Sequence, residues 1–150
     1  MKKFVLLLVT LVSFSFTSMA DDDKPIRVSE MPRQAQKFIE THFKGQTVAL
    51  AKMETDFMSK SYDVIFTNGD KLEFDKKGHW TKVDCEHSQV PTAVLPVAIQ
   101  KYIGQHYGRS KVKQIELTDR KGYEVELSNG VELKFNKKFQ VIDIDRRRTD

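Results

Sequence analysis

The chain has 150 residues, 39% hydrophobic and 31% charged, with a formal net charge of +4 at pH 7. Lys2 and Lys3 lie in a segment predicted to be removed, which leaves +4 − 2 = +2, so charge gives no support for nucleic acid or anionic membrane as a partner. The single cysteine, Cys85, excludes an intramolecular disulfide, and stability must therefore come from the core.

The first twenty residues have the pattern of a signal peptide. Two lysines precede an apolar run over 4–16, and Ser18-Met19-Ala20 forms a small-x-small cleavage motif. The run is shorter than the roughly 20 residues that a membrane-spanning helix needs. We therefore predict cleavage near Ala20, a mature chain of 21–150 that is periplasmic or secreted, and no stable membrane insertion.

The mature chain contains an internal repeat. "SYDVIFTNGDKLEFDKK" at 61–77 is echoed by "KGYEVELSNGVELKFNKK" at 121–138, an offset of 61, and the segments before them match at an offset of 64. Such a repeat indicates one supersecondary unit used twice, here 25–85 and 91–145. Each unit is too small to bury its own apolar face, so a single domain with a shared core is predicted.

Each unit is predicted to open with a short helix. Pro32 and Pro96 suit a first helical turn, and apolar residues follow at helical spacing over 31–43 and 95–107. Gly45 and Gly108 are expected to be left-handed C-caps.

Four strands are predicted to follow each helix: 48–55, 62–66, the strand after the Asn-Gly turn, and 79–85 in the first unit, with 112–118 and 140–145 in the second. In the second hairpin, a two-residue turn would pair apolar Tyr123 and Val125 with polar residues. A three-residue turn with a left-handed Gly130 pairs them with Phe135 and Leu133 instead, and this register is predicted in both units.

The predicted fold class is α+β, with about eight antiparallel strands and both helices on one face of the sheet. The other face is expected to be open and to carry mostly charged side chains, namely Asp63, Ile65, Lys71, Glu73, Glu124, Glu126, Glu132 and Lys134.

The tandem pattern P-x(6)-I, Y-x-V, NG and L-x-F-D-K-K-G, with Trp80 after the first unit, resembles the PepSY-like family. The second unit departs from it, with Phe139 and Val141 where the first has Gly78 and Trp80. The resemblance covers about 25–145. It implies a fold similar to that of the beta-lactamase-inhibitor protein and an exported binding or inhibitor-like module.

No motif in the sequence indicates an enzyme, a metal or a cofactor. His42 and His106 recur at matching helix positions, but their aromatic neighbours favour packed helix-edge histidines over metal ligands. Cys85 near His87 lacks an orienting partner, which favours a plain strand-end cysteine. The glutamates of the open face indicate a solvated strand surface rather than paired catalytic carboxylates, and Arg146-Arg147-Arg148 indicates a solvated tail.

The candidate contact residues come from a difference between the repeats. The first hairpin connection is three residues longer and contains Asp56, Phe57 and Met58, which either fold back onto the sheet edge or form a contact site. Trp80 faces the helices if the turn before it is bulged. If that turn has two residues, Trp80 lies on the open face beside Ile65. The candidate binding set is Asp56, Phe57, Met58, Ile65, Trp80, Lys71 and Glu73.

The leading functional hypothesis is a non-enzymatic exported module. It would hold a protein partner, such as an envelope hydrolase, on its open sheet face and the 55–60 loop. The alternative is a small-ligand or envelope-stress binding protein with a pocket between the sheet and the helices.

Overall fold

The structure is a computed structural model that describes residues 23–147, so the predicted signal peptide lies outside the described residues. Each unit consists of a short 3-10 helix, an α-helix and four strands, and the first unit has one further strand at its start. The first unit comprises β1 (Lys24–Ile26), a 3-10 helix (Val28–Glu30), α1 (Arg33–His42), β2 (Val48–Thr55), β3 (Lys60–Phe66), β4 (Lys71–Asp75) and β5 (Trp80–Asp84). The second comprises a 3-10 helix (Thr92–Val94), α2 (Val97–His106), β6 (Val112–Leu117), β7 (Tyr123–Leu127), β8 (Val131–Phe135) and β9 (Val141–Arg146).

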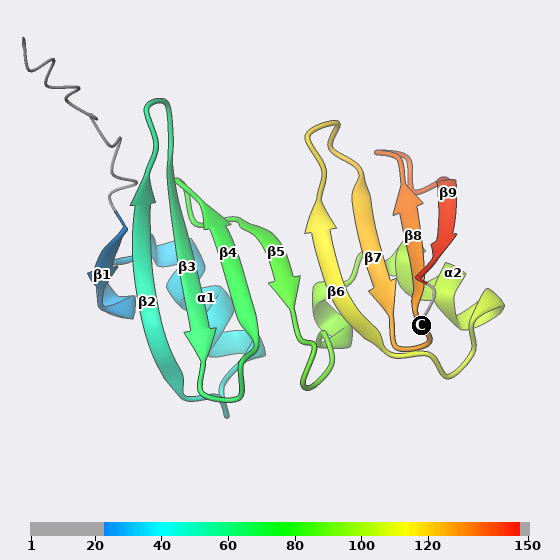
Figure 1. Ribbon diagram of the computed structural model, residues 1–150, viewed down its shortest axis with the longest axis horizontal. Coiled ribbons are helices and arrows are strands. Elements are labelled where there is room, and N and C mark those ends of the chain that lie inside the picture. The colour runs from blue at the N-terminus through cyan, green and yellow to red at the C-terminus, as the bar shows by residue number, and fades with distance from the viewer. Residues whose placement is uncertain (1–22, 148–150) are drawn as a thin grey trace, which may run out of the picture.

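The nine strands form one antiparallel sheet in chain order, and both helices lie behind it, on the same face (Figure 1). The predicted α+β class and the side of the helices are confirmed. The sheet has nine strands rather than about eight, because β1 pairs with β2 at the edge. This strand has only three residues, one of them a proline, and carries no alternating pattern, so it could not be predicted.

The predicted hairpin register is also confirmed. Tyr123 lies opposite Phe135 and Val125 opposite Leu133, and the first unit repeats this with Tyr62 opposite Phe74. Both three-residue turns end in a left-handed glycine, with φ of 77° at Gly130. This register places Tyr62, Val64, Tyr123 and Val125 on the helix side of the sheet.

The two helices pack on the sheet in the same way. In α1 the ring of Phe38 meets Phe74 edge-on at 5.6 Å, and in α2 the ring of Tyr102 meets Phe135 edge-on at 5.5 Å. The buried residues of both units form one core cluster. The sheet continues from one unit to the next through β5 and β6, where Val83 lies opposite Ile115.

The helix ends differ from the sequence prediction. Pro32 and Pro96 stand directly before the first helical residue, where their carbonyl groups accept the first hydrogen bonds. Gly108 is left-handed with φ of 52°, as predicted, but Gly45 is not, so that prediction is wrong. Because the helical segments of the two repeats match at an offset of 64, the residue equivalent to Gly108 is Lys44 and not Gly45. The helix α1 ends without a left-handed residue.

The turn after β4 shows why the repeats diverge at Gly78. Gly78 has φ of 86°, and a Cβ atom there would lie 2.8 Å from Ala35 N and from Pro32 Cβ at the start of α1. In the second unit Phe139 adopts the same left-handed conformation, with φ of 61°, and its ring stacks on Tyr123 at 5.5 Å. This stacking contact helps to offset a backbone conformation that is unfavourable for phenylalanine.

Candidate functional site

The β2–β3 hairpin ends in an exposed apolar tip. A backbone hydrogen bond of 2.9 Å from Asp56 N to Ser59 O closes the turn, and the Asp56 carboxylate accepts a further bond from Phe57 N at 2.6 Å. Phe57 is 96% exposed and Met58 is 86% exposed. The fold-back alternative is therefore wrong, and the apolar side chains point into solvent.

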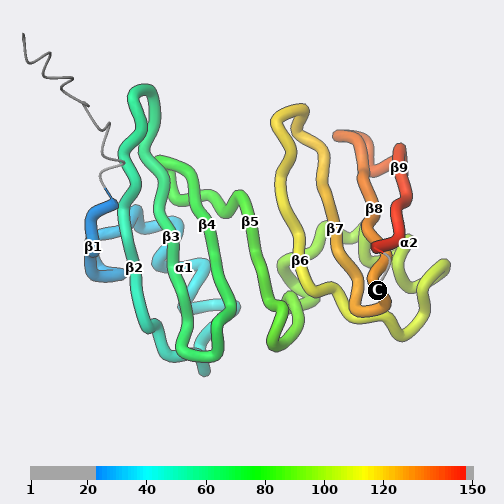
Figure 2. Tube along the Cα trace, in the orientation of Figure 1, coloured from blue at the N-terminus to red at the C-terminus, as the bar shows by residue number. Residues whose placement is uncertain are grey.

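The three extra residues lengthen the hairpin. The ladder of β2 and β3 continues beyond Met53–Tyr62 through Glu54–Ser61 and Thr55–Lys60, whereas the equivalent ladder in the second unit ends at Leu117–Tyr123. Figure 2 shows the hairpin reaching well past the neighbouring β4–β5 turn. The tip of the β2–β3 hairpin therefore lies away from the helices and the core.

The open face of the first unit carries a charged cluster. Asp63, predicted to be exposed, is only 4% exposed, because Lys71 and Lys52 cover its carboxylate at 3.1 and 3.6 Å. Lys71 also contacts Glu73 at 2.9 Å. Burial alone would lower the pKa of Lys71, but hydrogen bonds to Glu73 and Asp63 outweigh it and raise that pKa. Lys52 also contacts Asp23 and Glu54, so each lysine of the cluster is shared between carboxylates and offers a partner little free positive charge.

The candidate residues do not form one surface. Ile65 lies on the open face seven positions beyond Met58, which is about 23 Å away at roughly 3.3 Å per residue. Trp80 lies opposite Phe74 across a bulge and 6.5 Å from Tyr123, on the side of the helices. The open-face alternative for Trp80 is therefore wrong, and this residue cannot form a patch with Ile65.

The glutamates of the second unit lie among basic side chains on the open face. Lys134 is 3.6 Å from Glu132 and 3.9 Å from Glu124, and Arg147 is 3.2 Å from Glu126. Burial and a hydrogen bond to Glu132 raise the pKa of Glu124. Arg146 and Arg147 are exposed, as expected for solvated arginines, but Arg146 belongs to β9 and is not part of a frayed tail; Arg148 lies outside the described residues.

The thiol and imidazole groups are not arranged for catalysis. Cys85 is fully buried, and burial raises the pKa of its thiol to about 12. His87 is exposed and packs over Gly69 instead. The rings of His42 and His106 lie tilted against those of the aromatic residues one turn before them, Phe38 at 4.8 Å and Tyr102 at 4.3 Å. Within residues 23–147, no group of three or more histidine, cysteine or acidic side chains could hold a metal.

Sequence reasoning missed a buried carboxylate beside Cys85. Asp70 stands where the second unit has Val131, and its Oδ2 accepts hydrogen bonds from Ser88 Oγ at 2.5 Å and Asn68 Nδ2 at 2.8 Å. These bonds tie the β3–β4 turn to the segment between the repeats. The difference between Asp70 and Val131 at matched repeat positions was the available signal.

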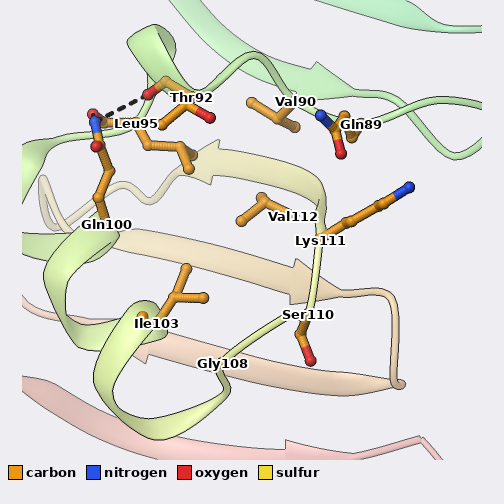
Figure 3. A pocket seen from close by; sticks show the side chains of 11 residues that line it. Gln89, Val90, Thr92, Leu95, Gln100, Ile103, Gly108, Ser110, Lys111 and Val112 are labelled. Atoms are coloured by element: carbon orange, nitrogen blue, oxygen red, sulfur yellow. Dashed lines mark hydrogen bonds between the residues drawn. The ribbon is translucent and has the colours of Figure 1, made fainter.

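A cavity of about 220 Å³ lies between α2 and the start of β6. Figure 3 shows Val90, Leu95, Ile103 and Val112 surrounding it, with Ser110 and Lys111 at its rim. The side-chain amide of Gln100 donates to the carbonyl oxygens of Thr92 and Leu95, at 2.9 and 2.8 Å, and so fixes one wall. The sequence predicted a pocket between sheet and helices only in general terms.

Comparison with known proteins identifies relatives of this chain. The family model described as "Putative beta-lactamase-inhibitor-like, PepSY-like" matches residues 60–143, more than half of the chain. No curated protein matches. Neither described helix has the length and apolar character needed to cross a membrane.

Three solved structures are similar over nearly their whole length. A Bacteroides thetaiotaomicron protein described as a "putative calcium-regulated periplasmic protein" is 60% identical, with a TM-score of 0.81, and the match covers 85% of this chain and 99% of that one. A periplasmic protein of Bacteroides vulgatus is 61% identical, with the same coverage and TM-score. A second B. vulgatus protein, described as periplasmic and of unknown function, is 38% identical with a TM-score of 0.75, covering 82% of this chain and 98% of that one.

Proposed function

From the premise that the chain belongs to the PepSY-like family, we propose that it is an exported binding module whose β2–β3 hairpin tip inserts into an apolar pocket of a protein partner. The observation that carries the proposal is the exposure of two large apolar side chains, Phe57 and Met58, at the end of a two-stranded ladder. Large apolar side chains that protrude together are typical of contact sites.

The surroundings of the tip define the partner's chemistry. Asp56, Ser59 and Lys60 flank the apolar pair, so the partner should have an apolar pocket with a polar rim of mixed charge. A projecting loop suits a cleft, and a hydrolase cleft agrees with the family's description as beta-lactamase-inhibitor-like. The periplasmic relatives and the predicted signal peptide support an envelope location for this partner.

The open face has a secondary role in this proposal. Asp63 and Glu73 are paired with lysines of the same face, so docking there would have to break existing ion pairs. We therefore assign the binding free energy to the tip. Burying Phe57 and Met58 on binding would contribute about 1.5–3 kcal/mol each.

The test is a photo-crosslinking residue placed at Met58 in cells of the source bacterium, with mass spectrometry to identify the adduct. The matched control places the same residue at Arg120, in the shorter hairpin of the second unit. We expect a saturable adduct from position 58 that is absent from position 120.

With the purified partner, Phe57→Ser combined with Met58→Ser should weaken binding at least a hundredfold and leave the melting temperature unchanged. Equal adducts from both positions, or unchanged affinity of the double variant, would refute the proposal.

A further inference from the structure

We propose that the cavity between α2 and β6 binds a small amphipathic carboxylate, with the hydrocarbon chain inside and the carboxylate at the rim. This site is separate from the hairpin tip and does not depend on the function proposed for it. The cavity volume of about 220 Å³ is below the roughly 300–1,000 Å³ of sites for drug-sized ligands, so the ligand should be smaller.

The interior of the cavity is apolar. Val90, Leu95, Ile103 and Val112 belong to the buried core and also line this space. In Figure 3 their side chains come from three elements, namely the segment between the repeats, α2 and β6. Aliphatic groups that converge from separate elements suit a hydrocarbon chain.

Gly104 lines this space without contributing a side chain. It lies inside α2, where glycine costs about 1 kcal/mol relative to alanine. The backbone does not require glycine, because φ is not positive, and a Cβ atom there would meet nothing within 4 Å. Gly104 is exposed and lines the cavity, so a longer side chain at this position has free space and can extend over the cavity.

The first unit has a different, more polar hollow at the matching helix positions. The offset of 64 pairs Gly104 with Glu40 and Gly108 with Lys44, so the two glycines beside the cavity correspond to long charged side chains in α1. The surface hollow along α1 is lined by Arg33, Lys37 and Glu40 and includes no residue of β2. The hollow beside α1 is larger, at about 890 Å³, whereas the smaller cavity beside α2 also contacts the start of β6.

The rim indicates the charge of the ligand. Lys111 is exposed beside the cavity, next to Ser110, and no acidic residue belongs to the lining. The amide of Gln100 is already engaged by two backbone carbonyl groups. The Lys111 side chain is directed away from the apolar cluster in Figure 3, and it would have to turn towards a ligand's head group at the rim. A lysine beside an apolar cavity favours an anionic head group over a cationic one.

The test is a nuclear magnetic resonance titration of the ¹⁵N-labelled protein with octanoate, octanol and octylamine. We expect octanoate to give saturable shifts centred on the amides of Ile103, Gly104 and Val112, with weaker binding of octanol and none of octylamine. Gly104→Leu should fill the cavity and weaken octanoate binding at least tenfold, while the matched Gly104→Ala retains it. The amide spectrum itself verifies that each variant is folded.

Lys111→Gln should weaken octanoate binding about fivefold, as expected for one partly exposed ion pair, and should remove the preference over octanol. The matched variant Lys101→Gln removes a charge from the exposed side of α2 and should change nothing. Shifts that do not saturate, equal binding of octylamine, or unchanged octanoate affinity in Gly104→Leu would each overturn the proposal.

Discussion

The two repeats meet along the β5–β6 strand pair, and we predict that Ile115→Ala destabilises both of them together. Three residue pairs join the strands, with Val83 opposite Ile115 at the centre. Both side chains are fully buried in the core cluster that both units share. If the units depend on each other, damage at this junction must lower the stability of the whole protein.

The size of the effect follows from burial. Truncation of a fully buried isoleucine to alanine costs about 2–5 kcal/mol, which is a large part of the roughly 5–15 kcal/mol that stabilises a typical domain. In a chain of this size each kcal/mol shifts the melting temperature by about 3–5 °C. We therefore expect Ile115→Ala to melt about 6–25 °C below the parent protein.

The assay uses two probes of urea unfolding. Trp80 is the only tryptophan, and its ring lies 6.5 Å from Tyr123 of the other unit, so its fluorescence reports on the junction. Far-ultraviolet circular dichroism reports on both units. In the parent and in the variant the two curves should coincide, with the midpoint lowered in the variant.

The control is Ile142→Ala, since Ile142 is 66% exposed on the edge strand β9 and its truncation should change the free energy of unfolding by less than about 0.5 kcal/mol. Fluorescence and dichroism curves with separate midpoints would refute the reasoning, because they would show that the repeats unfold independently. A midpoint of Ile115→Ala equal to that of the control would refute it as well.

Three further predictions concern single side chains. Gly122→Ala should destabilise the protein by several kcal/mol or prevent folding, because its Cβ atom would overlap the carbonyl oxygen of Phe135, and thermal melting measures this loss. Cys85 should resist iodoacetamide at pH 8 in the native protein and react once urea unfolds it, since burial raises the pKa of the thiol to about 12; rapid native labelling, read by mass spectrometry, would contradict this. Glu124 has a raised pKa, so the native state binds its proton more tightly than the unfolded chain, and stability falls as pH rises above the ordinary glutamate value of 4.5. Glu124→Gln should therefore raise the melting temperature at pH 7 and lose this advantage near pH 4; a gain that is equal at both pH values would argue against burial and Glu132 as the cause.

The repeat, the helix positions and the hairpin register could all be predicted from sequence. Alternation with period two allows only one register that buries Tyr123 and Val125 together, and a left-handed Gly130 is compatible with it. The helix positions and the hairpin register can be predicted because each depends on residues that are close together in the chain. Gly45 shows the limit of such predictions, since a glycine near a helix end is only one of several ways to end it.

The face of Trp80, the burial of Asp63 and the exposure of Phe57 were decided by tertiary structure. A bulge between Glu73 and Phe74 shifts the register by one residue, which alone determines whether Trp80 faces the helices or the open side. Asp63 is buried only because Lys52 and Lys71 from neighbouring strands close over it.

Three segments line the cavity beside α2, and one of them contributes Gly104, a residue without a side chain. Each of these residues can be read from the sequence, but the cavity forms only where the three segments come together in the fold. A local pattern determines which residues a segment buries, whereas a cavity or an exposed tip is set by how distant segments fill the volume between them.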